Sequence, residues 1–438
     1  MLKRVRESQT RYPPRSDFTR LPMTEIQQQL AALRARMARV MEDCAEKYER
    51  PRAPRPSEKP YFQDEDDRFA KLVPLPPGQE VVTSHGQHYE METLYPSHRN
   101  HGNADVGALS ELAPDLLRVL SNGTIANVPP SEWAFLDTET TGLSSGTGTC
   151  AFLIGVGWIT AEGFRVRQFF MRDYGEECSS LAALSQFLEP FRVLITYNGR
   201  TFDQPLLETR YRMNRARHPF AGLEHLDLLH GARRLWKLRF ESCRLVELEQ
   251  RILGYERTGD VPGWLIPNLF FEFLRTGSLR PLAPVFYHNA TDILSLACLT
   301  SVVPYAFNDP AGAPLRHGAE LAGIARWLEQ EGQNDTARTL YRRAIDAGLP
   351  DDLMFRTLWT LGQLERKMKC LDGALEIWND LAGSRNPFRA KALEELAKHH
   401  EHRAKDHVRA LELTRQALAF GESEALRKRE QRLAKRVG

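Results

Sequence analysis

Hydrophobic and polar positions divide the chain into an α/β part followed by an all-helical part. Three apolar runs predict β-strands, at 133–136, 152–159 and 164–171, with turn-like connections between them. The next segments predict helix at 179–190, strand at 193–197, helix at 204–213, a further candidate strand at 225–229, and helices at 243–253, 267–275 and 289–303. Three strands followed by alternating helices and strands predict a mixed α/β sheet.

The C-terminal part is helical throughout and repeats itself. Three triplets of small, large and apolar residues share the internal spacing 0, +4 and +7: Ala337, Tyr341, Ala344; Ala374, Trp378, Leu381; and Ala410, Thr414, Ala417. Periods of this length predict stacked helical hairpins, and residues 317–430 look like a degenerate tetratricopeptide array. An ordinary helical bundle is the alternative.

Ahead of the sheet, the pattern predicts an N-terminal extension over residues 1–60. Residues 1–22 are polar and basic and are predicted to be disordered, 24–48 have helical periodicity, and the four prolines in 51–60 indicate a linker. Residues 61–128 combine short apolar runs with turn residues, and we assign them to the N-terminal part of the α/β region. The predicted α/β domain itself covers 129–305.

Composition narrows the class of protein. At 438 residues the chain can form two or three domains, and its net charge of +2 argues against a bulk polyanion-binding surface. Six cysteines without a Cys-x-x-Cys pair favour reduced thiols in a cytoplasmic protein. No secretory signal follows the basic N-terminus, and no apolar run reaches membrane-spanning length, so we expect no membrane association.

Asp137 and Glu139 are the leading candidates for chemistry. They end the first apolar run of the sheet and are two residues apart, so an extended strand points both carboxylates to one side. Two like charges at such a distance are unfavourable unless a cation lies between them. Carboxylates are ligands for Mg²⁺, and metal sites of this kind support phosphoryl-transfer chemistry.

Two further segments can complete a carboxylate cluster. Asp203 follows a strand and a Gly-containing turn and lies near the start of a helix, where a carboxylate also has the simpler role of a cap. His288 and Asp292 are four residues apart, so a helix places them on one face. Asp203, His288 and Asp292 each have a common structural explanation, and their combination with the strand-end pair is what suggests a site.

Together these segments resemble the three motifs of the DEDD exonucleases, which have the ribonuclease H-like fold. Within them, the chain is similar to the YprB-like group, which joins such a domain to C-terminal tetratricopeptide-like helices. The matching segments beyond the carboxylates are 142–149, 242–245, 260–263 with 266–267, and 288–289. The resemblance covers about residues 60–305 and the helical tail in outline.

The resemblance implies a metal-dependent nuclease, a 3′→5′ exonuclease that acts on a single-stranded 3′ end of nucleic acid. Asp137, Glu139, Asp203 and Asp292 would hold two Mg²⁺ or Mn²⁺ ions, and His288 would act as the general base, since imidazole titrates near neutral pH. The residues expected to contact substrate are Thr138, Thr140, Asn198, Phe202 and Tyr287. Separately, helical solenoids present extended concave surfaces, so we expect the repeats to bind a protein partner or steer substrate.

The order of His and Tyr departs from the family pattern. DEDD exonucleases carry Tyr four residues or His five residues before the last Asp, whereas His288 is four and Tyr287 five residues before Asp292. One residue turns a helix by about 100°, so the base can be His288, Tyr287 or neither. A catalytically inactive nucleic-acid-binding or scaffold protein is therefore the alternative to an enzyme, and a protein-interaction module dominated by the repeats is a third.

Other residues give weaker signals. The pairs His85, His88 and His98, His101 have a spacing that can suit a metal, but no Cys or paired carboxylate accompanies them. Basic residues at 233–239 can contact a phosphate backbone, and a solvated helix face explains them equally well.

Overall fold

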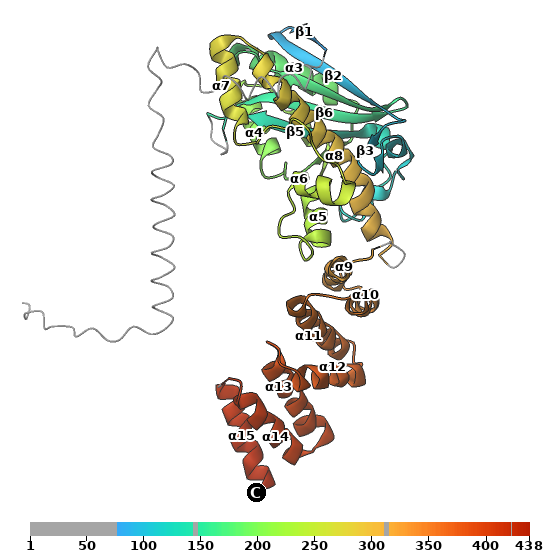
Figure 1. Cartoon of the computed structure of the whole chain (residues 1–438), viewed down its shortest axis with the longest axis vertical. Coiled ribbons are helices and arrows are strands. Elements are labelled where there is room, and N and C mark those ends of the chain that lie inside the picture. The colour runs from blue at the N-terminus through green and yellow to red at the C-terminus, as the bar shows by residue number, and fades with distance from the viewer. Residues whose placement is uncertain (1–76, 143–147, 311–314, 422) are drawn as a thin grey trace, which may run out of the picture. The chain divides into compact units, whose positions relative to one another are not determined.

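The computed structural model describes residues 77–142, 148–310, 315–421 and 423–438. The predicted disordered segment, helix and linker within residues 1–60 lie outside these residues. One mixed sheet forms the centre of the α/β domain (Figure 1), with the strand order β1-β2-β7-β6-β5-β8-β9. The strands are β1 (Gly78–Thr83), β2 (Gly86–Pro96), β5 (Trp133–Thr140), β6 (Ala151–Thr160), β7 (Gly163–Phe170), β8 (Val193–Thr196) and β9 (Glu224–Asp227).

Pairing directions confirm the predicted mixed sheet. β1, β2, β7, β6 and β5 pair antiparallel in succession, whereas β8 pairs parallel to β5 and β9 parallel to β8. The hairpin β1–β2 shows that the N-terminal region, assigned from its sequence only in outline, extends the edge of the same sheet. A separate two-stranded ribbon consists of β3 (Asn100–His101) and β4 (Ala104–Asp105).

Helices cover the sheet and follow it in sequence. Those of the α/β domain are α3 (Glu177–Leu188), α4 (Asp203–Met213), α5 (Leu228–Trp236), α6 (Leu245–Leu248) with the π-helical turn η6 (Glu249–Leu253), α7 (Ile266–Thr276) and α8 (Ala283–Asn308). The helix expected over 289–303 is longer because it begins at Ala283, with a proline in its first turn, where proline is favourable. The candidate strand at 225–229 ends at Asp227, whose side chain caps α5.

Alternation along β5 determines which side chains reach which layer. Trp133 and Phe135 pack into the core beneath α8, whereas Ala134 and Leu136 pack into the core beneath α3 and α4. Figure 1 shows α8 crossing the sheet, and it contacts β5, β6 and β7. A Cβ atom at Gly155 of β6 would lie 2.2 Å from Oδ1 of Asn289, so glycine allows α8 to approach the sheet there.

The helix α8 requires one correction. Among the described residues, Arg280–Asn308 is long and apolar enough to cross a membrane by length and composition, so the expectation that no apolar run has this length is wrong. Most of this segment is buried against the sheet and neighbouring helices. A central core helix has the same composition, since every side of it is covered by protein.

Beyond the sheet domain, the described helices form pairs. They are α9 (Gly318–Gln330), α10 (Asn334–Asp346), α11 (Asp351–Lys367), α12 (Leu371–Gly383), α13 (Arg389–His399) with the π-helical turn η8 (His400–Ala404), α14 (His407–Leu418) and α15 (Glu424–Val437). All nine residues of the repeating triplets are buried, on α10, α12 and α14. The predicted all-helical region of paired helices is therefore confirmed.

Candidate functional site

The end of β5 carries the first two carboxyl groups. Asp137 and Glu139 continue the series of Trp133 and Phe135, so they lie on the side of the sheet covered by α8. The Asn289 amide of α8 donates to Oδ2 of Asp137 at 2.9 Å, and it accepts a hydrogen bond of 2.9 Å from Gln168 of β7. The first carboxylate is thus positioned by a side chain of α8, which Gln168 holds in turn from β7, two strands away in the sheet.

Asp203 is the first residue of α4 and follows the turn after β8. Asn198 in this turn has a left-handed backbone (φ 71°), and its N–H donates to Oδ1 of Asp227 at 2.8 Å. Thr138 of β5 donates to Oδ1 of Asp203 at 2.5 Å, which connects the helix start to the strand end. Phe202, immediately before Asp203, is 49% exposed.

On α8, His288 and Tyr287 face different surroundings. Nδ1 of His288 contacts Oδ1 of Asp260 at 2.7 Å, and Nε2 lies 3.7 Å from Oδ2 of Asp292. The Tyr287 hydroxyl contacts the hydroxyl of Tyr255 at 2.7 Å. Because successive helix positions point about 100° apart, His288 is the one beside the last carboxylate.

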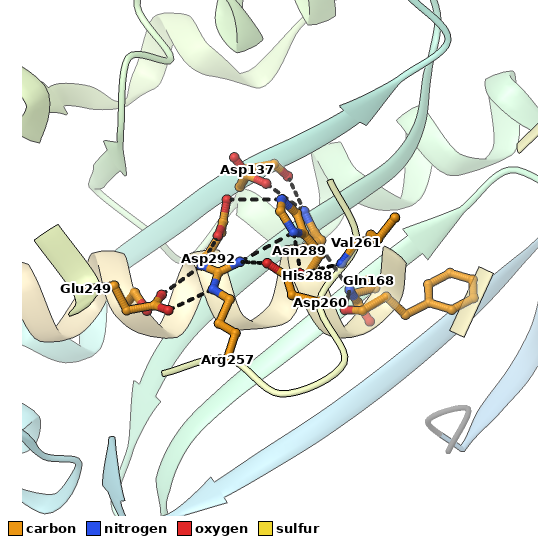
Figure 2. Close-up of polar contacts among 11 residues, drawn as sticks. Asp137, Gln168, Glu249, Arg257, Asp260, Val261, His288, Asn289 and Asp292 are labelled. Atoms are coloured by element: carbon orange, nitrogen blue, oxygen red, sulfur yellow. Dashed lines mark hydrogen bonds and ion pairs between the residues drawn. The ribbon is translucent and has the colours of Figure 1, made fainter. Parts of the chain in front are cut away.

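The buried Arg257 connects three acidic residues, Glu249, Asp260 and Asp292 (Figure 2). Nη2 of Arg257 donates to Oδ1 of Asp292, while its Nε and Nη2 donate to the two oxygens of Glu249, each at 2.7 Å. Nη1 also donates to Oδ2 of Asp260 at 3.2 Å. Glu249 lies in the π-helical turn η6, a type of irregularity that is frequent at functional sites.

The carboxyl groups of the site repel one another. Burial, and then the charges of Asp292, Glu139 and Asp203, hold the pKa of Asp137 well above its usual range. Burial is also the main reason that the pKa of Glu139 rises to about 8 and that of Asp203 to about 6. These mutual charge effects show that acidic groups from β5, α4 and α8 converge on one region.

The acidic neighbours that disfavour ionised carboxylates favour the charged form of His288. Burial alone would lower the pKa of its imidazole, but the charge of Asp292 and the hydrogen bond to Asp260 raise it to about 10. The imidazole is therefore a cation at neutral pH in the metal-free protein. Burial also opposes ionisation of Asp260, and the contact with His288 more than offsets it, so that the pKa of Asp260 falls below its usual value.

The donor chemistry of three residues suits a divalent cation. Asp137, Glu139 and Asp203 offer carboxylate oxygens, the ligands preferred by Mg²⁺, and burial, which raises their pKa values, makes their ionised forms costly unless a cation binds them. Asp292 differs, because Arg257 already neutralises it. Across the described residues, no group of three or more His, Cys, Asp or Glu side chains is preassembled to hold a metal ion.

The sheet order and the acidic strand end define a domain of the ribonuclease H class. Residues 134–303 match the family model of the RNase H superfamily. The chain is also 35% identical to the uncharacterized protein YprB of Bacillus subtilis (strain 168), over 289 residues that make up 65% of this chain and 68% of that protein. The chain therefore belongs to the YprB family and carries an RNase H superfamily domain.

The structure also places the remaining predicted residues. Thr138 contacts Asp203, whereas Thr140 donates to the carbonyl of Gly142 in a turn. Of the histidine pairs, His88 contacts Ser179 and Glu90, and His101 contacts Ser295. No described metal-ligand cluster includes them.

Sequence reasoning assigned no site role to several residues that organise the carboxylates: Gln168, Glu249, Arg257, Asp260 and Asn289. Two of them lie in segments that carry the family resemblance, Asp260 in 260–263 and Asn289 beside His288. Their place in these segments is the sequence signal that could have identified Asp260 and Asn289 as site residues. Gln168, Glu249 and Arg257 gave none, because their role depends on contacts between distant segments.

Proposed function

We propose that this chain is a metal-dependent nuclease that hydrolyses phosphodiester bonds from a single-stranded 3′ end. The observation that carries this proposal is that carboxyl groups from β5, α4 and α8 are brought together in an RNase H superfamily domain, through the contact of Thr138 with Asp203 and of Asn289 with Asp137. Nucleic acid is itself an anion, so it can approach this cluster only when cations offset the negative charge.

In this proposal Asp137, Glu139 and Asp203 hold Mg²⁺ or Mn²⁺. The bound cation would activate a water and stabilise the leaving 3′ oxygen. His288 is the candidate for taking the proton of the attacking water. The charge of Glu139 is among those that raise its pKa, so a cation bound by Glu139 would lower this pKa and favour the neutral imidazole that can accept a proton.

Features around the cluster support a nucleic-acid substrate. Phe202 exposes its ring beside Asp203, where a base can stack on it. A cavity of about 550 Å³ adjoins the turn that precedes Asp203, and its lining includes Asn198 and the basic residues Arg233, Lys237 and Arg244. Such cations can contact the phosphate backbone of a strand that ends at the carboxylates.

The paired helices α9–α15 have a separate role in this proposal. Their buried triplets at offsets of 37 and 36 residues are typical of tetratricopeptide-like hairpins. Such arrays present extended surfaces that bind protein partners. We propose that this region binds a partner or guides substrate in a cytoplasmic protein.

Degradation of 3′-labelled and 5′-labelled single-stranded DNA and RNA tests the nuclease. With Mg²⁺ or Mn²⁺, the 5′ label should move through a ladder of shorter fragments, and EDTA should stop the reaction. Asp137→Asn should be inactive, whereas Asp380→Asn, a change on the exposed surface of α12, should leave the rate unchanged. Equal cleavage by the Asp137 variant would refute the assignment.

The same assay addresses a second candidate function, an inactive nucleic-acid-binding protein. This alternative is favoured by the ion pair between Arg257 and Asp292, which occupies one of the four carboxylates. Binding of single strands without cleavage under any metal condition would support it.

A further inference from the structure

Arg257 is a buried cation inside an acidic site. Its side chain is 4% exposed, and it forms ion pairs with Glu249, Asp260 and Asp292. An arginine guanidinium does not lose its proton in proteins, so this positive charge is permanent. The acidic partners hold its pKa far above the usual value, although burial alone would lower it.

The guanidinium is also anchored by a residue outside the four carboxylates of the proposed site. Glu249, 1% exposed, holds Nε and Nη2 in a bidentate pair, and it accepts a further hydrogen bond from the hydroxyl of Ser295. Ser295 in turn contacts Nε2 of His101 at 2.7 Å. Breaking a buried pair of this kind is strongly destabilising because it leaves an uncompensated buried charge, so Arg257 is a fixed part of the site.

Asp292 is consequently the one carboxylate of the four whose two oxygens both face basic groups. Oδ1 accepts from Arg257, and Oδ2 lies 3.7 Å from Nε2 of His288. A second divalent cation at Asp292 would have to lie beside a buried guanidinium. Repulsion between two such charges is strong in a poorly solvated site.

We propose that Arg257 is a built-in counter-ion that takes the place of one of the two divalent cations. The site then binds a single Mg²⁺ or Mn²⁺ ion, through Asp137, Glu139 and Asp203. Arg257 is a positioning residue that acts through Asp292. This inference rests on the proposed metal-dependent function and specifies the number of metal ions and the residue that replaces the second.

Counting bound Mn²⁺ tests the proposal without reference to activity. The metal-free full-length chain is titrated with Mn²⁺, and free Mn²⁺ is followed by its electron paramagnetic resonance signal. Mn²⁺ that binds elsewhere on the surface is measured with the Asp137→Asn protein, and this amount is subtracted from the total. We expect one Mn²⁺ per chain in the wild type and in Arg257→Lys, which keeps the charge.

The informative variant combines Arg257→Met with Glu249→Gln, so that no buried carboxylate at 249 is left unpaired. Loss of the guanidinium releases Asp292, and the number of bound Mn²⁺ ions should rise from one to two. A merely structural role for Arg257 would leave the number at one or lower it, and either result in the folded variant contradicts the proposal. If this variant does not fold, the number of Mn²⁺ ions bound by the wild-type protein still tests the proposal.

Two Mn²⁺ ions in the wild type would overturn the inference. With cleavage of nucleic acid retained, that result removes the counter-ion role of Arg257 and leaves the proposed function intact. One bound ion without any cleavage would refute the proposed nuclease function and leave the counter-ion role of Arg257 intact. Absence of bound Mn²⁺ would overturn both.

Discussion

Asn289→Ala should weaken both the fold and the site, because the Asn289 side chain connects β5, β7 and α8. Its Nδ2 donates to Asp137, at 2.9 Å to the carboxylate and 3.3 Å to the main-chain oxygen, and its Oδ1 accepts from Gln168 at 2.9 Å. The side chain is fully buried. Truncation therefore removes hydrogen bonds from Asp137 on β5 and from Gln168 on β7.

The magnitude follows from these contacts. Each intramolecular hydrogen bond contributes about 0.5–1.5 kcal/mol net, and a buried group left unsatisfied costs about 1–3 kcal/mol. Gln168 keeps its second bond, to the carbonyl of Phe286 at 2.9 Å, which limits the loss on that side. We expect the free energy of unfolding to fall by about 2–4 kcal/mol in metal-free protein.

Urea unfolding monitored by circular dichroism in EDTA measures this change, and Mn²⁺ titration measures its effect on the site. Affinity for Mn²⁺ should fall as well, since Asp137 loses the group that orients it. Asn268→Ala on the exposed surface of α7 is the matched control and should change stability by less than about 0.5 kcal/mol. Unchanged stability and unchanged Mn²⁺ affinity in Asn289→Ala would refute the reasoning.

Three further predictions concern charge. Glu401→Gln should destabilise the C-terminal helices by about 1–2 kcal/mol in thermal unfolding, because this buried carboxylate pairs with arginines of α15; an unchanged melting temperature would contradict it. Burial, and then Arg257, lower the pKa of His101 to about 4, so protonation favours the unfolded state, and stability present above pH 6.5 is lost as the pH falls toward 4. Between pH 7.5 and pH 5 this loss is about 2 kcal/mol, and His101→Gln, compared with wild type by urea unfolding at both pH values, should remove it. In EDTA at pH 7, Asp292→Asn should lower the free energy of unfolding by about 2–4 kcal/mol through its ion pair with Arg257. Asp203→Asn should raise it by about 1 kcal/mol, because the substitution removes a buried charge. Equal effects in urea unfolding would refute the distinction.

Much of the fold could be predicted because its signals are local. The strand alternation of β5 and the apolar runs of β6 and β7 depend on neighbouring residues alone, and so do the buried triplets of α10, α12 and α14. The hairpin β1–β2 was assigned only to a region, since its residues become a sheet edge by pairing with β7, distant in sequence. Helix α5 could not be predicted from sequence, because the apolar residues after Asp227 are equally consistent with a strand.

The candidate site shows the same limit. The carboxylates Asp137, Asp203 and Asp292 stand at recognisable places, a strand end and two helix segments, and they could be proposed from sequence. Arg257 could not, because an arginine in a loop is most often solvated, whereas this one is buried and paired with Asp292, which is distant in sequence. The pKa of His288 was also beyond sequence reasoning, since it depends on Asp260 as well as on Asp292.

The structure divides a set of four similar carboxylates into two electrostatic classes. Asp292 is balanced by Arg257 and His288 and held within a network of ion pairs, whereas Asp137 and Glu139, with Asp203, repel one another. A cation gains most where negative charge is uncompensated, so the unbalanced half is where metal binding should release the most free energy. Asp292, paired with Arg257 and His288, keeps its position without metal. In such a site, ion pairs hold the carboxylate of α8 in place without metal, whereas the carboxylates of β5 and α4 need a bound cation. Metal binding should therefore stabilise β5 and α4.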